Sequence, residues 1–289
     1  MANTETWWSR FWELFLKAIF GPKISNYHES VKISEIKALY DQVIADYNNS
    51  KFPMLDDGYK LAGHIVGEAL NKSQVQVSSE LTVILFDVVL DLATQEAFFG
   101  VIEIDWDKKI SLSEQIELRE SLKKVQNTYI HAESYLTIWA ETLIEIFTTI
   151  FKALPPIIPS DSEQDSFSVP VIHLMEKPKN TVEQVLMCFA KETLFKEKIF
   201  QKICENINHN VKIISGFDLE EKRDSIKKII YPLNSNLEGI ELSTAYFRGT
   251  PFDDIFKSPY PINIPISSRL EHTHILAGTG YGKTQLIQK

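Results

Sequence analysis

The sequence is poor in cysteine and has no excess of basic residues, and both shortages limit what the protein can be. Only two cysteines, Cys188 and Cys204, occur in 289 residues. Both lie in apolar helical patterns, so we expect buried, reduced thiols in a cytosolic protein rather than a disulfide-bonded scaffold. Lysine and arginine total 30 against 39 acidic residues, a net charge of −9, which argues against a broad surface that coats nucleic acid.

The acidic excess is confined to the first half of the chain. Residues 1–160 contain 14 basic and 22 acidic residues, whereas residues 161–289 contain 16 and 17. In the second half, acidic side chains are interleaved with the lysines, so we interpret the lysines as parts of solvated helix faces rather than as a path for DNA. The first half is not expected to hold DNA either, because phosphate binding requires concentrated positive charge.

Long apolar runs without charges are also missing. The two longest candidates, residues 81–99 and 135–154, each contain three charged residues, and charges at such depths are costly in lipid. We therefore predict no transmembrane span and a cytoplasmic protein. The aromatic, amphipathic segment Trp7–Phe20 has two open interpretations: it docks on the protein's own core or on a partner, or it lies in a membrane interface.

The first half reads as a bundle of helices. Apolar residues recur at helical spacing in five segments, and Ser111 with Glu114 forms a capping-box pattern at the start of one of them. We expect an N-terminal helical domain over residues 1–154, with helices at 30–48, 58–71, 79–98, 111–132 and 132–154.

A proline-rich and Ser/Asp-rich stretch at 155–166 predicts a linker, because its prolines cannot continue a helix and its polar run has no apolar face to bury. Beyond it, alternating patterns predict an α/β region over residues 167–289. The expected strands are 167–175, 211–214, 237–247 and 261–266. The expected helices are 178–195 (opened by Pro178 and a capping box at Asn180 and Glu183), 200–206 and 218–230.

Two acidic groups in the first half are candidate chemical sites. Glu141 and Glu145 lie one turn apart on the polar stripe of a helix, and Glu103, Asp105 and Asp107 alternate along a turn. Neither group has the histidine, glycine or terminal glutamate that acid–base or calcium chemistry would require at this spacing. We expect solvated surfaces at both.

The most informative segment is the apolar run that ends in Gly278-Thr279-Gly280-Tyr281-Gly282-Lys283-Thr284-Gln285. The three glycines allow backbone N–H groups to point at phosphate oxygens. Lys283 supplies a positive charge for the β- and γ-phosphates, and the Thr284 hydroxyl supplies a ligand for Mg²⁺. The segment therefore predicts binding of ATP and Mg²⁺, with Ala277 replacing the first glycine of the usual Walker A pattern.

Together with the preceding Arg269-Leu-Glu-His-Thr-His274, this loop resembles the FtsK/HerA superfamily of P-loop ATPases, in particular its conjugative coupling, TraG/TraD-like branch. The resemblance covers residues 250–289. It implies the start of a RecA-like core, cut off after the Walker A loop, in a hexameric motor that moves DNA with ATP and Mg²⁺. The acidic strand and any arginine finger would follow Lys289, so we expect this chain alone not to hydrolyse ATP.

A second hypothesis stays open beside the motor. The acidic helical half and the aromatic N-terminal segment favour binding of a protein partner or a membrane complex, with nucleotide acting only as a switch. The two hypotheses differ in whether DNA or a protein partner stimulates ATP hydrolysis in the intact protein.

Overall fold

The computed structural model describes residues 32–54, 58–101, 103–107, 109–155, 166–217 and 229–263. In this part of the chain the protein is mostly helical and has one two-stranded antiparallel sheet. The helices are α2 (Ile33–Asn49), α3 (Gly58–Ser73), α4 (Ser79–Gln95), α5 (Leu112–Ile130), α6 (Ala132–Lys152), α7 (Val171–Leu174), α8 (Pro178–Cys188), α9 (Glu192–Lys196), α10 (Gln201–Ile214), α11 (Gly239–Phe247) and α12 (Pro251–Lys257), with short 3-10 turns η1 (Phe52–Met54) and η4 (Pro232–Asn234).

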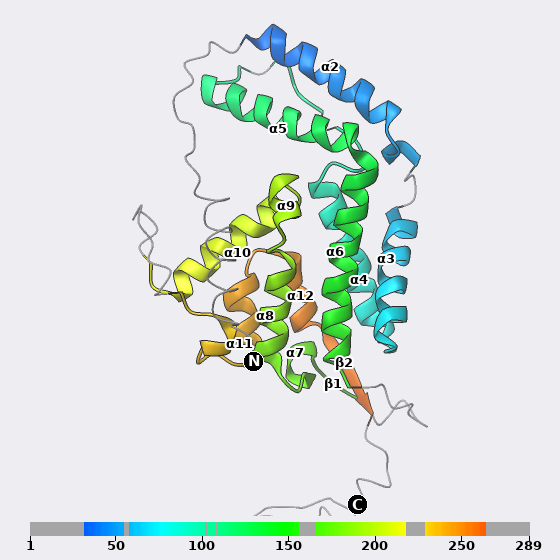
Figure 1. The fold of residues 1–289 in the computed structure, drawn as a ribbon, viewed down its shortest axis with the longest axis vertical. Helices are drawn as coiled ribbons and strands as arrows, with labels where there is room; N and C mark the ends of the chain where they lie inside the picture. The colour runs from blue at the N-terminus through cyan, green and yellow to red at the C-terminus, as the bar shows by residue number, and fades with distance from the viewer. Residues whose placement is uncertain are drawn as a thin grey trace, which may run out of the picture.

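Helix α6 forms the centre of the molecule, with α3 against one side and α8 against another (Figure 1). Large apolar side chains recur along it at every fourth position and are almost completely buried, at Tyr135, Trp139, Leu143, Phe147 and Phe151. This spacing places them on one face of the helix. The predicted helices of the first half are confirmed, with ends that differ by a few residues.

Helices α2 and α5 lie side by side at the end of the molecule away from the sheet (Figure 1). The centroids of the Tyr47 and Tyr129 rings lie 5.1 Å apart near the ends of the two helices. Gln126 Nε2 donates a hydrogen bond to Asp46 Oδ2 at 2.9 Å. The predicted capping box is present, since Ser111 accepts from the amide of Glu114 and the Glu114 carboxylate accepts from the amide of Ser111. The capping box explains the sharp start of α5.

The predicted strands at 211–214 and 237–247 are wrong, because both segments are helical. Val211–Ile214 is the last turn of α10, and Gly239–Phe247 forms α11. Their β-branched and aromatic residues favour strands locally. However, Ile203, Ile207 and Val211 recur at helical spacing and bury one face of α10 in the core, and this tertiary burial outweighs the local preference.

Strand β1 (Ser166–Pro170) pairs antiparallel with β2 (Pro259–Asn263), with Val169 opposite Tyr260. The strand predicted at 167–175 therefore ends at Pro170, and the next four residues form α7. Strand β2 confirms the first part of the extended segment predicted at 261–266. The alternating α/β pattern is wrong for the described residues. Of the residues 250–289 that carry the predicted start of a RecA-like core, those after Asn263 lie outside the described part of the chain.

The helix predicted at 178–195 is divided into α8 and α9. Its start at Pro178 is confirmed, and the predicted capping box of Asn180 and Glu183 is wrong. Helix α8 begins at Pro178, which fits the first helical position because proline lacks the N–H that would be unsatisfied there. The Glu183 carboxylate instead accepts from the amide of Leu233 at 3.0 Å. The segment predicted helical at 200–206 belongs to α10, and most of the segment at 218–230 lies outside the described residues.

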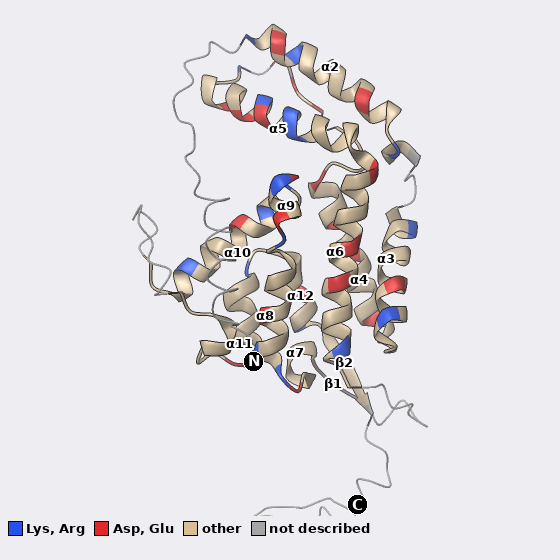
Figure 2. Ribbon diagram, viewed as in Figure 1, with Lys and Arg blue, Asp and Glu red and all other residues tan. Residues whose placement is uncertain are grey.

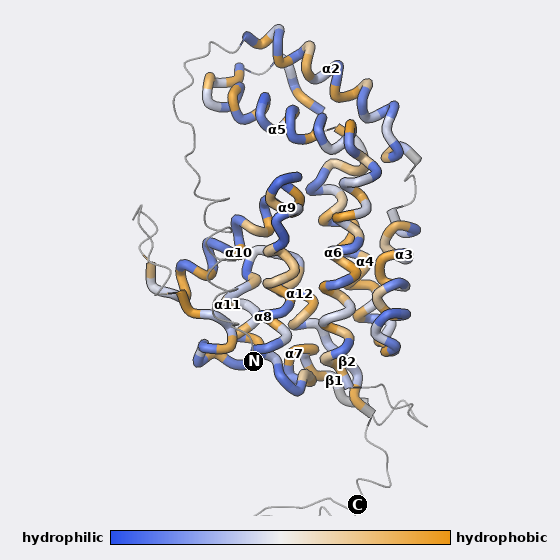
Figure 3. The backbone as a smooth tube through the Cα atoms, viewed as in Figure 1, coloured by the Kyte–Doolittle hydropathy of each residue, from blue (hydrophilic) through white to orange (hydrophobic). Residues whose placement is uncertain are grey.

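Helices on both sides of the predicted linker share one buried apolar cluster. It includes Leu85 and Trp139 before the linker and Phe189, Phe200 and Phe252 after it. Helices α6, α8 and α12 all contribute apolar residues to this cluster, and apolar stretches along α6 and α12 are visible in Figure 3. Residues 156–165 of the predicted linker lie outside the described residues, and the division into domains at 1–154, 155–166 and 167–289 stays a prediction.

None of the described helices combines the length and the apolar character that a membrane span needs. The segment Trp7–Phe20 lies outside the described residues, so both interpretations of it stay open.

Candidate functional site

The predicted nucleotide site lies outside the described residues. This applies to every member of the loop and to the residues before it that carry the family resemblance, namely Arg269–His274, Gly278, Thr279, Gly280, Tyr281, Gly282, Lys283, Thr284 and Gln285. The description ends at Asn263 of β2. Binding of ATP at this loop, and of Mg²⁺ by Thr284, therefore stays a prediction.

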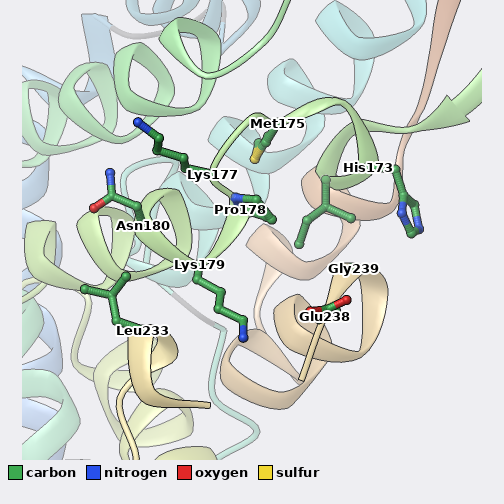
Figure 4. Close-up of a pocket in the computed structure, with 10 residues that line it drawn as sticks. His173, Met175, Lys177, Pro178, Lys179, Asn180, Leu233, Glu238 and Gly239 are labelled. Carbon is green, nitrogen blue, oxygen red and sulfur yellow. The ribbon is translucent and has the colours of Figure 1, made fainter. Parts of the chain in front are cut away.

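Within the described residues, a cavity of about 960 Å³ opens where α7, the first turn of α8, η4 and the start of α11 meet (Figure 4). It is lined by Ile172, His173, Met175, Lys177, Pro178, Lys179, Asn180, Leu233, Glu238 and Gly239. Its size is in the range of sites that take small organic molecules. None of its lining residues was singled out from the sequence as a binding residue, because they come from three segments that only the fold brings together.

Two backbone features shape the wall between α7 and α11. Gly239, the first residue of α11, has a φ of +52°, and a Cβ built there would lie 2.6 Å from Cε1 of His173. The positive φ favours glycine at this position, and a larger residue would also have to displace the His173 imidazole. Neither α8 nor α11 has a side-chain hydrogen bond at its N-cap, so the first N–H groups of both helices have no side-chain acceptor there.

The cavity combines an apolar floor with positively charged groups. Ile172 and Met175 are 1% and 5% exposed, and Leu233 and Pro178 add apolar surface to its walls. Lys179 Nζ donates to the Ser235 carbonyl at 2.7 Å, which places the ammonium beside η4.

Lys177 lies at the opposite edge of the same opening (Figure 4) and is 72% exposed. The nearest carboxylate to its ammonium is that of Glu176, at 3.9 Å. An ammonium group with so loose a partner remains available to another anion.

A buried carboxylate on α8 holds the η4 wall in place. Glu183 is 6% exposed, and burial raises its pKa, an effect that the N–H donor of Leu233 partly offsets. The hydroxyl of Tyr246 donates to the Ile230 carbonyl at 2.8 Å just before η4, and burial raises the pKa of Tyr246 to about 12. The η4 wall is thus tied to both α8 and α11.

A second polar cluster surrounds Glu96, at the C-terminal end of α4, and is closed rather than open. Its carboxylate accepts from Tyr135 Oη at 2.7 Å and from the amide of Phe200 at 2.8 Å, and it lies 3.3 Å from Lys124 Nζ. Phe200 has a left-handed φ of 56° at the N-cap of α10. The carboxylate therefore takes the place of a side-chain cap for α10. Because both oxygens have partners, we interpret this cluster as structural.

The remaining acidic candidates behave mostly as the sequence predicts. Glu103, Asp105 and Asp107 are exposed, and Glu141 is exposed as well. Glu145 differs, because its carboxylate is hydrogen-bonded to Lys191 and so links α6 to the segment before α9. Over the parts of the chain that the structure describes, no group of three or more His, Cys, Asp or Glu residues is placed to hold a metal ion.

Both cysteines are buried and unpaired, as predicted. Burial raises the pKa of Cys188 and of Cys204 to about 12, so the reactive thiolate form is strongly disfavoured at neutral pH. Neither thiol has the microenvironment of a nucleophile.

Basic and acidic residues alternate along α2, α5, α9 and α10, as the blue and red segments of the ribbon in Figure 2 show. Lys196 pairs with Glu192 at 2.8 Å, one turn away on α9. This supports the interpretation of these lysines as solvated helix faces.

Comparison of the chain with protein-family models, with curated proteins and with solved structures gives no match.

Proposed function

We propose that the chain binds ATP together with Mg²⁺ through residues 278–285. The observation that carries the proposal is the sequence Gly278-Thr-Gly-Tyr-Gly-Lys283-Thr284 directly after an apolar segment. Backbone N–H groups of such a loop cradle the phosphates, Lys283 neutralises their charge, and the hydroxyl of Thr284 binds the metal ion. The described helices precede this loop in the chain and supply none of these groups.

Titration of the full chain with a fluorescent ATP analogue in the presence of Mg²⁺ tests the proposal. We expect Lys283→Ala to weaken binding about 10- to 100-fold, because a charge-assisted contact to phosphate is lost. Lys289→Ala is the matched control, since it removes the same side chain a few residues outside the loop, and we expect it to bind as the original chain does. Equal affinity of Lys283→Ala and the original chain would contradict the proposal.

By its resemblance to the FtsK/HerA superfamily, we further propose that the chain is the N-terminal part of a ring-forming motor that translocates DNA. In this proposal the chain assembles as a homo-oligomer, and a RecA-like core continues beyond Lys289 with the acidic strand that activates water. The chain alone then binds ATP without hydrolysing it. The two unpaired, buried cysteines support a cytoplasmic location.

A second candidate function is partner binding by the helical part, with nucleotide as a switch. The observation that favours it is the acidic excess of the first half, with 22 acidic and 14 basic residues in positions 1–160. Such a surface suits a protein partner with complementary positive charge rather than DNA. The decisive measurement is ATP hydrolysis by the protein that includes the complete core, with and without duplex DNA. Stimulation by DNA supports the motor, and hydrolysis that is indifferent to DNA supports the switch.

A further inference from the structure

We propose that the cavity between α7, α8, η4 and α11 binds a small amphipathic organic anion, that is, a carboxylate, sulfonate or phosphate ester with an apolar body. All lining residues of this site lie between Ile172 and Gly239, and none of them belongs to the predicted nucleotide loop. The proposal does not depend on whether the loop binds ATP.

The volume and the floor of the cavity require an apolar body. About 960 Å³ is far more space than an inorganic anion fills. Leu233 exposes 52% of its area at the edge of the cavity, whereas Ile172 and Met175, at 1% and 5%, are almost completely buried beneath it. A ligand that covers Leu233 removes apolar area from water, which contributes roughly 25 cal/mol per Å².

The charged groups favour a ligand that carries an anion. Lys177 and Lys179 both line the cavity from opposite edges, and one carboxylate, that of Glu238, lies near Gly239 on the side of the Lys179 ammonium (Figure 4). The Lys179 ammonium donates to the Ser235 carbonyl, and since an ammonium has three donors, it retains others for a ligand. The amide of Asn180 adds hydrogen-bonding capacity at the same edge as Lys177 (Figure 4). The arrangement is a small number of polar groups around an apolar surface, as is usual in sites for organic ligands.

Binding of 8-anilinonaphthalene-1-sulfonate to the full chain tests the proposal, because this probe combines an aromatic body with a sulfonate and its fluorescence rises in an apolar site. We expect saturable binding that octanoate displaces. 1-Octanol, which lacks the charge, and inorganic phosphate, which lacks the apolar body, should displace it much less. Displacement by octanol as effective as by octanoate would overturn the requirement for an anion.

Two variants locate the probe without disturbing the core. Lys177→Gln removes a charge from a side chain that is 72% exposed, and we expect affinity to fall about three- to fivefold, as for other contacts of a largely exposed ammonium. Leu233→Trp fills the opening at its exposed edge and should abolish most of the binding. Lys196→Gln is the matched control, because this lysine is 70% exposed on α9 and does not line the cavity.

Unchanged binding in both cavity variants would overturn the proposal. The variant Lys283→Ala separates the two sites: we expect it to bind the probe normally even where it has lost ATP. Loss of probe binding in Lys283→Ala, with normal binding in Leu233→Trp, would place the probe at the nucleotide loop and would also refute the proposed cavity site.

Discussion

Replacement of Glu96 by alanine is the strongest test of how the helices before the predicted linker are joined to those after it. The Glu96 carboxylate is 7% exposed and accepts hydrogen bonds from Tyr135 on α6 and from the amide of Phe200 at the start of α10. Without it, a buried hydroxyl and a buried N–H lose their acceptor. Each loss costs about 1–3 kcal/mol, and the Lys124 ion pair is lost as well. We therefore expect the free energy of unfolding to fall by roughly 3–5 kcal/mol, the usual cost of breaking a buried pair.

Urea unfolding followed by circular dichroism measures this loss. Glu96→Gln keeps a carbonyl acceptor and should lose less stability than Glu96→Ala. Glu133→Ala is the matched control, because its ion pair with Lys51 is largely exposed (79% and 62%) and such pairs contribute about 0–1 kcal/mol. Adding Tyr135→Phe to Glu96→Ala should cost less than the sum of the two single changes, since the unpaired hydroxyl is removed. Equal losses in Glu96→Ala and Glu133→Ala would refute the reasoning.

Two further predictions concern the cavity wall. Gly239→Ala should destabilise the fold by more than about 1 kcal/mol in urea unfolding, because of its positive φ and the 2.6 Å contact with His173. Gly67→Ala, inside α3 with no atom within 4 Å of the new Cβ, should instead stabilise it by about 0.5–1 kcal/mol; the reverse order would contradict this account. Burial raises the pKa of Glu183 above its usual 4.5, so the folded state keeps that proton longer than the unfolded state does. The free energy of unfolding relative to Glu183→Gln should then decrease as the pH rises from about 4 to about 7, and a difference that is constant over this range would show that Glu183 does not titrate in this way.

Helices with strong local signals were predictable from the sequence alone. The Ser111–Glu114 capping box and the four-residue spacing of large side chains between Tyr135 and Phe151 identify α5 and α6. A cap acts within one turn, and helical periodicity is a property of consecutive residues, so neither needs information from elsewhere in the chain. The burial of both cysteines followed from the same apolar patterns. The chemistry proposed for residues 278–285 likewise comes from residue types and spacing alone.

Whether the short segments after the predicted linker form helices or strands is determined by the tertiary structure. Val211–Ile214 and Gly239–Phe247 have residues that suit strands as well as helices, and they became helices because their apolar faces pack into the common core. Glu183 has the spacing of a capping residue, yet its partner is Leu233, 50 residues further along the chain.

Long-range contacts also decided the polar cluster and the cavity. The Glu96 carboxylate accepts a hydrogen bond from the amide of Phe200, which lies 104 residues further along the chain. The cavity likewise forms from separate segments near Ile172, Leu233 and Gly239. A sequence pattern reports on residues that are neighbours along the chain. Which carboxylate satisfies a buried N–H, and which side chains surround a cavity, depends on how distant helices pack, so these features could be read only from the fold.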